Sequence, residues 1–412
     1  MKILFINSNR YKFPPVIPIG IEYLAGSLSK TQHTYKICDL CFSDKPIDDL
    51  NKALAKFKPE IVGITIRQID TVLYQNNEFF LPEIKSYVDL CKLFGCKVIL
   101  GGSGYSIMPQ QILKYTRADY GIEGPGELAL IHLLNKLKSN KNVPSIINGY
   151  SYFKNLYYHF KREILFDYKK YFNNGGIAGF RTQIGCNENC IFCTEGNKRI
   201  IYHHPESVAK EIAQIKQLGY TKFHLCDSEF NLNLEHCIKV CKAMCNICGS
   251  TNWALYMKPG PYSDELFYWL NKSGADLITL SLNTNYSAYD KLKNFCLAAS
   301  KNNIKIAVDL STGFPNEDIE SLKLMLDTLD KLPVETVGVN SFYRIYPGTP
   351  LFNVINNGEV TQEFLINWDI NTDYIKPVFY NYFNEQTLRK AIAGRKKFRI
   401  EGFEKATNYQ RV

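Results

Sequence analysis

Two neighbouring stretches near the N-terminus, KILFINS (2–8) and GIEYLAGSLSK (20–30), set the fold class. The first is a run of apolar, β-prone residues, and the second repeats its apolar residues at helical spacing. Further strand-like runs follow, each separated from the next by an amphipathic stretch: YKICDL (35–40), EIVGITI (60–66), KVILGG (97–102) and DYGIEG (119–124). This alternation predicts an α/β domain over residues 1–150, with a Rossmann-like, doubly wound parallel sheet.

The alternation stops at an aromatic and basic stretch, 151–172, and then begins again. The later strand-like runs are GIAGFRTQI (176–184), KFHLC (222–226), NWALYM (252–257), LITLSL (277–282), IKIAVDL (304–310) and TVGVNSFYRI (336–345). Six βα repeats predict a partial (βα)6 barrel of the TIM type. We therefore expect a first domain 1–150, a linker 151–172, a barrel 173–350 and a C-terminal cap or substrate-binding extension 351–412.

Composition excludes several classes of protein. The chain has 412 residues, 45% of them hydrophobic and 22% charged, as in globular proteins of two or three domains. Its net charge of 49 − 40 = +9 is scattered, without the basic, aromatic stripe of a nucleic-acid reader. No apolar run is long enough for a membrane span. Because the thirteen cysteines are odd in number and unevenly placed, we expect a reducing, cytoplasmic location.

A cysteine motif follows the first strand of the second series. In GCNENCIFCTEG (185–196), Cys186, Cys190 and Cys193 have the spacing Cys-x3-Cys-x2-Cys. Three thiolates on one short loop can hold three irons of a [4Fe-4S] cluster and leave the fourth iron open. An open iron can chelate the amino and carboxylate groups of S-adenosylmethionine (SAM). We expect Phe192 to cover the cluster and exclude water.

A zinc site is the alternative for these cysteines. It needs a fourth ligand, and His203 and His204 lie a few residues further on. The position of the loop after a first barrel strand favours the cluster. We expect Gly185 and Gly196 to allow the tight turns of that loop.

The segment LEHCIKVCKAMCNIC (234–248) repeats the cysteine spacing, but its pattern is that of a helix and not of a metal-binding loop. Cys237, Cys241 and Cys245 recur every four residues, which places them along one face of a helix. No glycine turn precedes them. We therefore favour core packing of small, apolar thiols over a second metal site that would also include Cys248.

The cysteine loop resembles the radical SAM signature, and the segments around it resemble the cobalamin-binding radical SAM family. Members of that family pair a Rossmann-like cobalamin domain with a radical SAM barrel. The similar segments cover most of residues 1–352: VIPIGIEYLAGSL (16–28), PEIVGITIR (59–67), KVILGGSGYSIMP (97–109), ADYGIEGPGE (118–127), RIIYHHPESVAKEI (199–212), LCDSEFNLN (225–233) and RIYPGTPL (344–351).

The resemblance implies a set of SAM-site residues beside the cluster cysteines. Asp227, Ser228 and Glu229 resemble the stretch that meets the SAM amino group. At the ends of the fourth and fifth barrel strands, the resemblance places the ribose beside Ser281 and Asn283 and the adenosine beside Asp309 and Gly313. The fourth-strand segment departs from the family pattern, which is richer in glycine and acidic residues.

For cobalamin, the expected contacts lie at the carboxyl ends of the first-domain strands. The turn Gly101, Gly102, Ser103 and Gly104 can bring backbone close to a bulky ligand. Glu123, Gly124 and Glu127 precede and open a helix, where they would line the nucleotide tail or the corrin amides.

The Asp-x-His-x-x-Gly motif of His-on cobalamin proteins is absent, so we expect base-off cobalamin without a histidine ligand. Arg67 could lie under the cobalt and discourage axial coordination, or it could instead pair with Asp70 or a corrin propionamide. Tyr105 is a second candidate for the lower face.

The resemblance implies a cobalamin-dependent radical SAM methyltransferase. It would alkylate an unactivated carbon or phosphorus centre through a 5′-deoxyadenosyl radical and methylcobalamin, with electrons from a flavodoxin or ferredoxin. The organic substrate is not identified by the sequence. Cyclisation or rearrangement without methyl transfer is an alternative, and a cobalamin and iron–sulfur sensor is an alternative of another class. A simple electron carrier would not need two αβ domains.

Overall fold

The structure, a computed structural model, describes residues 1–402 and divides into two compact units. Unit 1 comprises Met1–Thr71, Asn77–Ile177 and Asn371–Pro377, and unit 2 comprises Val72–Asn76, Ala178–Ile370 and the chain from Val378 onward. Residues 151–172, expected as a linker, belong to unit 1. Among the described residues, no helix combines the length and apolar character that crossing a membrane requires.

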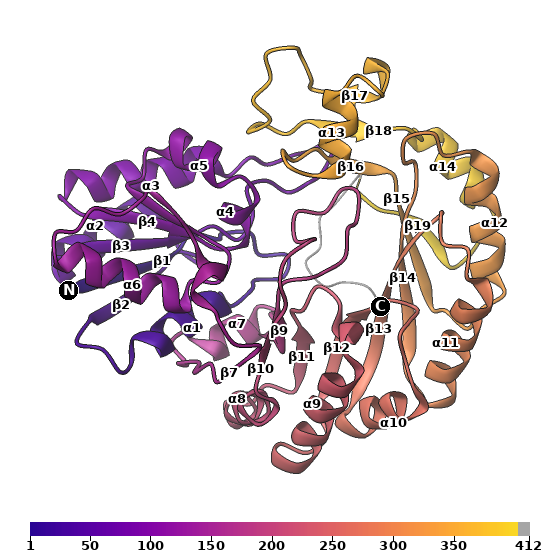
Figure 1. Ribbon diagram of the computed structural model, residues 1–412, viewed down its shortest axis with the longest axis horizontal. Coiled ribbons are helices and arrows are strands. Elements are labelled where there is room, and N and C mark those ends of the chain that lie inside the picture. The colour runs from indigo at the N-terminus through magenta and orange to yellow at the C-terminus, as the bar shows by residue number, and fades with distance from the viewer. Residues whose placement is uncertain (403–412) are drawn as a thin grey trace. The chain divides into compact units, whose positions relative to one another are not determined.

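Unit 1 is built on a six-stranded parallel sheet, drawn in indigo and purple in Figure 1. The strand order is β2-β1-β3-β4-β5-β6. The strands are β1 (Lys2–Asn7), β2 (Thr34–Asp39), β3 (Ile61–Thr65), β4 (Lys97–Gly101), β5 (Tyr120–Glu123) and β6 (Ile146–Asn148). The chain leaves β1 in one direction for β2 and returns on its other side as β3, so the topological switch point lies between β1 and β3.

The helices of unit 1 form two groups, as in a doubly wound sheet. Helix α1 packs against α6, while α3 packs against α2 and α5. The bounds are α1 (Ile19–Leu28), α2 (Pro46–Phe57), α3 (Leu81–Leu93), α4 (Ser103–Ile107), α5 (Pro109–Thr116), α6 (Glu127–Lys138), η1 (Gly149–Tyr152), β7 (Tyr157–Tyr158) and α7 (Tyr168–Asn173). The predicted Rossmann-like fold class is confirmed.

A buried ion pair holds residues 161–168 against α1. The Glu22 and Arg162 side chains are 0% and 1% exposed, and Arg162 Nε lies 2.6 Å from Glu22 Oε2. The Tyr168 hydroxyl donates to the same carboxylate oxygen at 2.6 Å, and the Leu165 amide donates to the other at 3.0 Å. Because Arg162, Leu165 and Tyr168 all lie in the segment expected to be a linker, their bonds to Glu22 make this segment an integral part of unit 1.

Unit 2 is built on a seven-stranded parallel sheet. Its order is β19-β15-β14-β13-β12-β11-β8. The strands are β8 (Ala178–Phe180), β11 (Lys222–Leu225), β12 (Asn252–Met257), β13 (Ala275–Asn283), β14 (Lys305–Ser311), β15 (Thr336–Asn340) and β19 (Phe398–Ile400). The six predicted strand runs all contribute, but two of them break. GIAGFRTQI divides into β8 and β9 (Gln183–Ile184), and TVGVNSFYRI divides into β15 and β16 (Phe342–Arg344).

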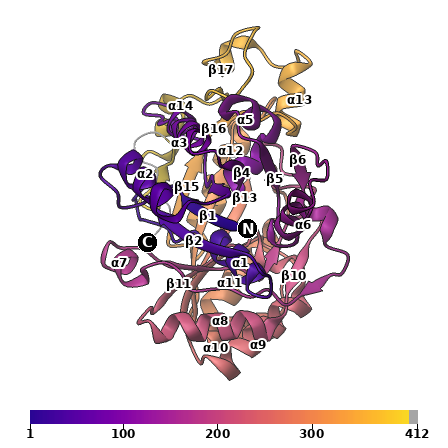
Figure 2. The same ribbon diagram turned by 90° about the vertical axis from the view of Figure 1, so that its left-hand side faces the viewer.

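Helices alternate with these strands and cover the sheet. They are α8 (Pro205–Gln217), η2 (Phe230–Leu232), α9 (Leu234–Ile247), α10 (Asp264–Ser273), α11 (Tyr289–Lys301) and α12 (Ile319–Asp330), and the short β10 (Ile201–His203) pairs antiparallel with β9. Figures 1 and 2 show α8, α9 and α10 side by side. Cys237 and Cys241 on α9 are fully buried, as predicted for core thiols, whereas Cys245 is half-exposed.

The C-terminal segment is more than the cap or extension that the sequence suggests. It contains α13 (Pro350–Asn356), η3 (Gln362–Phe364), β17 (Leu365–Ile366), β18 (Phe379–Asn381) and α14 (Glu385–Ile392) before β19. Strand β18 pairs with β16 and β17, and β19 extends the large sheet beyond β15. A seventh strand was not predicted, because its three residues follow a basic stretch without a β pattern. Residues 403–412 of the predicted extension lie outside the described residues.

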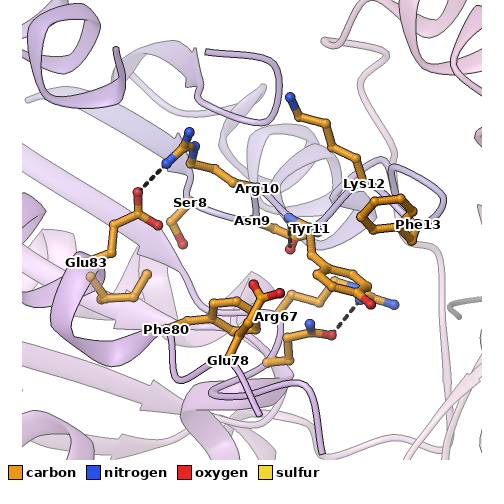
Figure 3. A pocket seen from close by; sticks show the side chains of 12 residues that line it. Ser8, Asn9, Arg10, Tyr11, Lys12, Phe13, Arg67, Glu78, Phe80 and Glu83 are labelled. Carbon is orange, nitrogen blue, oxygen red and sulfur yellow. Dashed lines mark hydrogen bonds and ion pairs between the residues drawn. The ribbon is translucent and has the colours of Figure 1, made fainter. Parts of the chain in front are cut away.

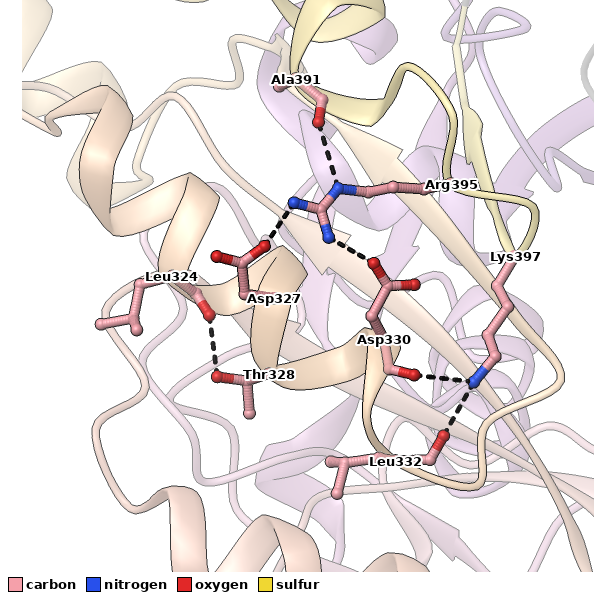
Figure 4. Close-up of polar contacts among 8 residues, drawn as sticks. All are labelled: Leu324, Asp327, Thr328, Asp330, Leu332, Ala391, Arg395 and Lys397. Carbon is pink, nitrogen blue, oxygen red and sulfur yellow. Dashed lines mark hydrogen bonds and ion pairs between the residues drawn. The ribbon is translucent and has the colours of Figure 1, made fainter.

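Ionic contacts fix the entry to β19 (Figure 4). Arg395 bridges Asp327 and Asp330 at the end of α12. Lys397 donates to the carbonyl oxygens of Asp330 at 3.2 Å and Leu332 at 2.9 Å. The last strand is thus attached to the helix that precedes β15.

Removing the cation of the buried pair in unit 1 should lower the free energy of unfolding much more than removing the cation of an exposed pair. Arg162→Met leaves the Glu22 carboxylate buried without its counter-ion, so we expect it to lower the free energy of unfolding by about 3–5 kcal/mol. Lys85→Met removes the exposed Lys85–Asp89 pair on α3 and should cost less than about 0.5 kcal/mol. Urea unfolding followed by circular dichroism measures both, and equal losses would contradict the role of the buried pair.

Candidate functional site

The cysteine loop is closed by backbone hydrogen bonds between its two ends. Lys198 N–H donates to the Cys186 carbonyl at 2.8 Å, and Asn197 N–H donates to the Glu188 carbonyl at 2.9 Å. Gly185 has φ +86°, and a Cβ there would lie 2.3 Å from the Arg199 carbonyl oxygen. A Cβ at Gly196 would lie 2.6 Å from the Glu188 carbonyl oxygen, so both glycines allow close backbone approach, as expected.

The three thiols lie on this loop with different exposure. Cys186 is buried, Cys193 is half-buried and Cys190 is exposed. Burial raises the pKa of Cys186 to about 11, and burial with the neighbouring Cys193 raises the pKa of Cys190 as well. The thiols are therefore protonated near neutral pH, and binding iron has to displace their protons.

The zinc alternative needs a fourth ligand beside the three thiols. Among residues 1–402, no three His, Cys, Asp or Glu side chains converge as ligands of one metal ion. His203 is 1% exposed, and its Nε2 accepts a hydrogen bond from Arg181 Nε at 3.1 Å, so this nitrogen is already engaged. In a cubane each thiolate holds a different iron, so the three sulfurs need not meet at a single point.

Phe192 belongs to a stack of three aromatic rings. Its ring centroid lies 5.0 Å from that of Tyr343 and 6.2 Å from that of Phe314, with interplanar angles of 25° and 6°. The Tyr343 hydroxyl donates to the Thr312 carbonyl at 2.7 Å. This stack joins the cysteine loop to the ends of β14 and β15 and places an apolar surface beside the third cysteine.

Asp227, which follows β11, makes its hydrogen bonds to other residues of the protein. It is 5% exposed, and its carboxylate accepts from Thr182 N at 2.8 Å, Thr182 Oγ1 at 2.5 Å and Gln183 N at 3.2 Å. Burial raises its pKa to about 6, although these hydrogen bonds favour the charged form. Both oxygens are therefore engaged in fixing the backbone that leads from β8 into the cysteine loop.

Glu229 has a different environment from its neighbour Asp227. It is 9% exposed, and its Oε2 atom has no hydrogen-bond partner among the described residues. Burial raises its pKa to about 7, partly offset by a hydrogen bond with Ser281 on β13 and by the charge of Lys258. Ser228 between the two acids is exposed. The structure therefore brings Glu229 and Ser281 together and leaves one carboxylate oxygen for a ligand.

The remaining predicted positions lie at the ends of β13 and β14. Asn283 is exposed, and half-buried Asp309 accepts a hydrogen bond from the Tyr256 hydroxyl at 3.5 Å. Gly313 has φ +78°, and a Cβ there would lie 3.2 Å from Ser341 Cβ. Positive φ and close packing both explain the glycine.

Sequence reasoning missed Glu317, which organises the turn after β14. It is 6% exposed and accepts from Thr312 Oγ1 at 2.5 Å, Gly313 N at 2.9 Å and Phe314 N at 3.1 Å. The available signal was TGFPNE (312–317), where an acid follows a Gly-Phe-Pro turn within reach of its amides.

The glycine turn of unit 1 packs against protein. A Cβ at Gly102, which has φ +100°, would lie 2.5 Å from the Ile66 carbonyl oxygen, and one at Gly104 would lie 2.8 Å from the Gln68 amide nitrogen. Ser103 Oγ donates to the Arg67 carbonyl at 2.8 Å. These contacts fix the backbone after β3. Gly101 alone has open space beside it, since the nearest atom to its Cβ position is 4.0 Å away.

The residues after β5 are also largely packed. The Tyr150 ring would lie 2.6 Å from a Cβ at Gly124, and Glu127 is 4% exposed. Glu123 is half-buried at the end of β5. Tyr105 is 0% exposed, and its hydroxyl lies where a Cβ at Gly121 would be, so its ring contacts the sheet and no open face.

A cavity of about 400 Å³ lies at the carboxyl ends of β1 and β3, at the switch point. The loop Ser8–Phe13 and Arg67 line it, together with Gln68, Glu78, Phe80, Glu83 and Ile84 (Figure 3). Arg67 Nη1 donates to Gln68 Oε1 at 2.8 Å. Sequence reasoning placed ligands at the carboxyl ends of these strands but named no contact residue in the loop after β1, because no motif identifies one. The cavity fits part of a ligand at this edge of the sheet.

Comparison with known proteins identifies a B12-binding domain in unit 1. Residues 14–134 match the B12-binding domain family. The chain is 20% identical to a tryptophan 2-C-methyltransferase of Streptomyces laurentii, over 84% of this chain and 73% of the relative. It is 22% identical to an uncharacterized methyltransferase of Pyrococcus horikoshii, over 91% of this chain and 86% of the relative.

Two solved enzymes share the fold. One is the radical S-adenosylmethionine methyltransferase TsrM from Kitasatospora setae, solved with tryptophan and a SAM analogue. Its TM-score is 0.83 at 20% identity, and the match covers 95% of this chain and 88% of the TsrM chain. The other is OxsB, a cobalamin-dependent S-adenosylmethionine radical enzyme, with a TM-score of 0.71 at 15% identity. That match covers 95% of this chain and 66% of the OxsB chain. Residues 14–134 therefore match a B12-binding domain, and the chain shares its fold with these two enzymes, with the Cys186–Cys193 motif after β8, the first strand of the large sheet of unit 2.

Proposed function

We propose that the protein is a cobalamin-dependent radical SAM methyltransferase that acts on an organic substrate. The observation that carries this proposal is the closed cysteine loop beside a buried carboxylate oxygen of Glu229 that has no partner among residues 1–402. The similarity to a methyltransferase that acts on tryptophan supports methyl transfer and an aromatic acceptor as the first substrate class to test. An unactivated carbon or phosphorus centre is the general target that we propose.

Cys186, Cys190 and Cys193 would hold the cluster, and Phe192 would shield it from water on the side of the aromatic stack. When bound, the cluster supplies the electron that cleaves SAM, and cobalamin supplies the methyl group. The contribution of the chain is to position these groups and to exclude water. A flavodoxin or ferredoxin is the electron donor that we propose, and the thirteen free cysteines suit a cytoplasmic enzyme.

The predicted SAM contacts separate into two roles. We assign Glu229 to the SAM ammonium group, because its Oε2 is buried and has no partner among the described residues. A bound cation would favour the charged carboxylate and lower the pKa of Glu229. Asp227 is a positioning residue, because its oxygens already accept from Thr182 and Gln183. Ser281 and Asn283 remain candidates for the ribose, Asp309 and Gly313 for the adenosine, and the exposed Ser228 for a peripheral contact.

We propose that cobalamin binds base-off at the carboxyl edge of the unit 1 sheet. Arg67 lines the cavity there, and its backbone is fixed by Ser103 and Gly104. A guanidinium group under the cobalt would not coordinate it, because arginine remains protonated in proteins. Gly101, Glu123 and Glu127 stay candidate contacts, whereas buried Tyr105 offers no open face.

Rearrangement without methyl transfer is the second candidate. The shared fold with OxsB, a cobalamin-dependent S-adenosylmethionine radical enzyme, keeps a second reaction class open. A product mass that rises by one methyl group separates the two reactions.

The raised pKa of Glu229 predicts a pH-dependent stability. Its folded pKa of about 7 lies above the ordinary 4.5, so the folded protein binds this proton more tightly than the unfolded chain does. Its stabilising contribution is complete below pH 4.5 and is lost as pH rises through 7. Glu229→Gln should therefore be more stable than wild type at pH 8, on the order of 1–3 kcal/mol, and similar at pH 4.5. Glu335→Gln, at an exposed acid before β15, is the control, and urea unfolding of both apo-proteins at the two pH values tests the difference.

Paired cysteine variants test the reaction. After anaerobic reconstitution with iron and sulfide, wild type and Cys241→Ala should hold four irons per chain. Cys190→Ala should lose the cluster. With SAM, hydroxocobalamin, a strong reductant and tryptophan, only the first two should form 5′-deoxyadenosine and a methylated product. Product without 5′-deoxyadenosine would refute radical chemistry, and 5′-deoxyadenosine without a methylated product from any acceptor tried would favour rearrangement.

The base-off proposal has its own spectroscopic test. In electron paramagnetic resonance of the protein with cob(II)alamin, wild type should show no nitrogen splitting from a lower axial ligand. Arg67→Ala should admit water to the cobalt and change the spectrum. Lys114→Ala, which removes an exposed cation from α5, should leave the spectrum unchanged. A nitrogen triplet in the wild-type spectrum would show that the base or a histidine is bound.

A further inference from the structure

A buried amide donor without a partner in the described part of the chain lines the cavity of unit 1. Asn9 is 9% exposed, and its Nδ2 has no hydrogen-bond partner among residues 1–402. Arg10 Nε, from the same loop, is also buried and has no partner within the same range. Buried donors are nearly always satisfied in folded proteins, so two such atoms beside one cavity point to acceptors supplied by a ligand.

The orientation of the Asn9 amide is determined by its neighbours. Tyr11 N–H donates to Asn9 Oδ1 at 3.3 Å, and Asn9 N–H donates to Asn7 Oδ1 at 3.2 Å. A flipped amide would set the Tyr11 N–H against the Asn9 NH2 group, donor against donor. The carbonyl oxygen is therefore used by the loop, and Nδ2 is the atom left over.

The loop is held in place by two contacts of the Arg10 guanidinium group. Arg10 Nη1 donates to Glu83 Oε1 at 2.6 Å (Figure 3), and Arg10 Nη2 donates to the Ser43 carbonyl at 3.2 Å. These bonds attach the loop to α3 and to the segment after β2. A donor fixed in advance loses little entropy when an acceptor arrives, which favours a specific contact over an adaptable one.

We propose that Asn9 is a binding residue for the corrinoid: its Nδ2 donates to a side-chain amide carbonyl on the rim of the corrin ring. The inference rests on the proposed function, which places cobalamin at this edge of unit 1. A whole corrinoid is larger than the cavity of about 400 Å³, so the cavity receives only part of the ligand. The corrin rim carries several amide side chains, and their carbonyl oxygens are the acceptors that Asn9 and Arg10 lack.

The test measures binding of two corrinoids, aquacobalamin and diaquacobinamide, to the full-length protein by optical titration. Both carry the corrin amides, but cobinamide lacks the nucleotide tail. Asn9→Asp keeps an oxygen for the Tyr11 amide and replaces the NH2 donor by an acceptor. We expect Asn9→Asp to raise the Kd for both corrinoids by tenfold or more, an effect of about 1.4 kcal/mol. Asn51→Asp, on the exposed face of α2, carries the same charge change and should bind as wild type does.

Three outcomes would overturn the inference. Unchanged Kd values for Asn9→Asp would mean that Nδ2 meets no acceptor. A loss for cobalamin alone would place Nδ2 beside the nucleotide tail. Failure of wild type to bind either corrinoid would refute cobalamin binding itself, which is the failure of the proposed function. If Asn9→Asp does not fold, as judged by thermal unfolding, Asn9→Ala is titrated in its place with the same expected loss for both corrinoids.

Discussion

The carboxylate of Asp227 is the interaction on which the barrel site depends. It joins the end of β11 to the backbone of Thr182 and Gln183, at the point where the chain leaves β8 for the cysteine loop. A buried carboxylate that accepts two backbone N–H groups and a hydroxyl fixes direction as well as distance. The cysteines begin only three residues beyond Gln183, so an error in this short connection would be carried directly to the thiols.

Similar carboxylates organise the other turns that matter. Glu317 accepts from two backbone amides and a hydroxyl after β14, and Glu22 accepts from Arg162, Tyr168 and the Leu165 amide in unit 1. In each case a buried carboxylate accepts hydrogen bonds from irregular backbone that belongs to no sheet or helix. Glu229 is the exception among the buried acids of the barrel, because one of its oxygens has no partner in the described part of the chain. That contrast separates structural acids from a ligand-binding acid.

The sequence predicts much of this architecture, because periodic apolar runs report burial directly. The strand runs, the α9 thiols and the loop glycines Gly185 and Gly196 all follow from local pattern. Contacts between segments distant in sequence do not. The Glu22–Arg162 ion pair places the expected linker in unit 1. Strand β19 pairs with β15, although its sequence has no β pattern. Gly102 and Gly104 were expected to face a ligand, but they make room for residues 66–68. A glycine signals close approach without saying what approaches.

The closure of the cysteine loop by backbone bonds has a consequence for how the metal centre is assembled. The Cys186–Lys198 and Glu188–Asn197 hydrogen bonds need no metal, and the Phe192 stack adds apolar contacts to them. In small zinc domains the ion must supply the folding free energy, because the ligand loop has no structure without it. Here these bonds and the aromatic stack come from the chain itself, so we expect metal insertion to follow folding. Cells that delay iron delivery would then accumulate a folded precursor, with Cys190 as the exposed thiol of the cysteine loop.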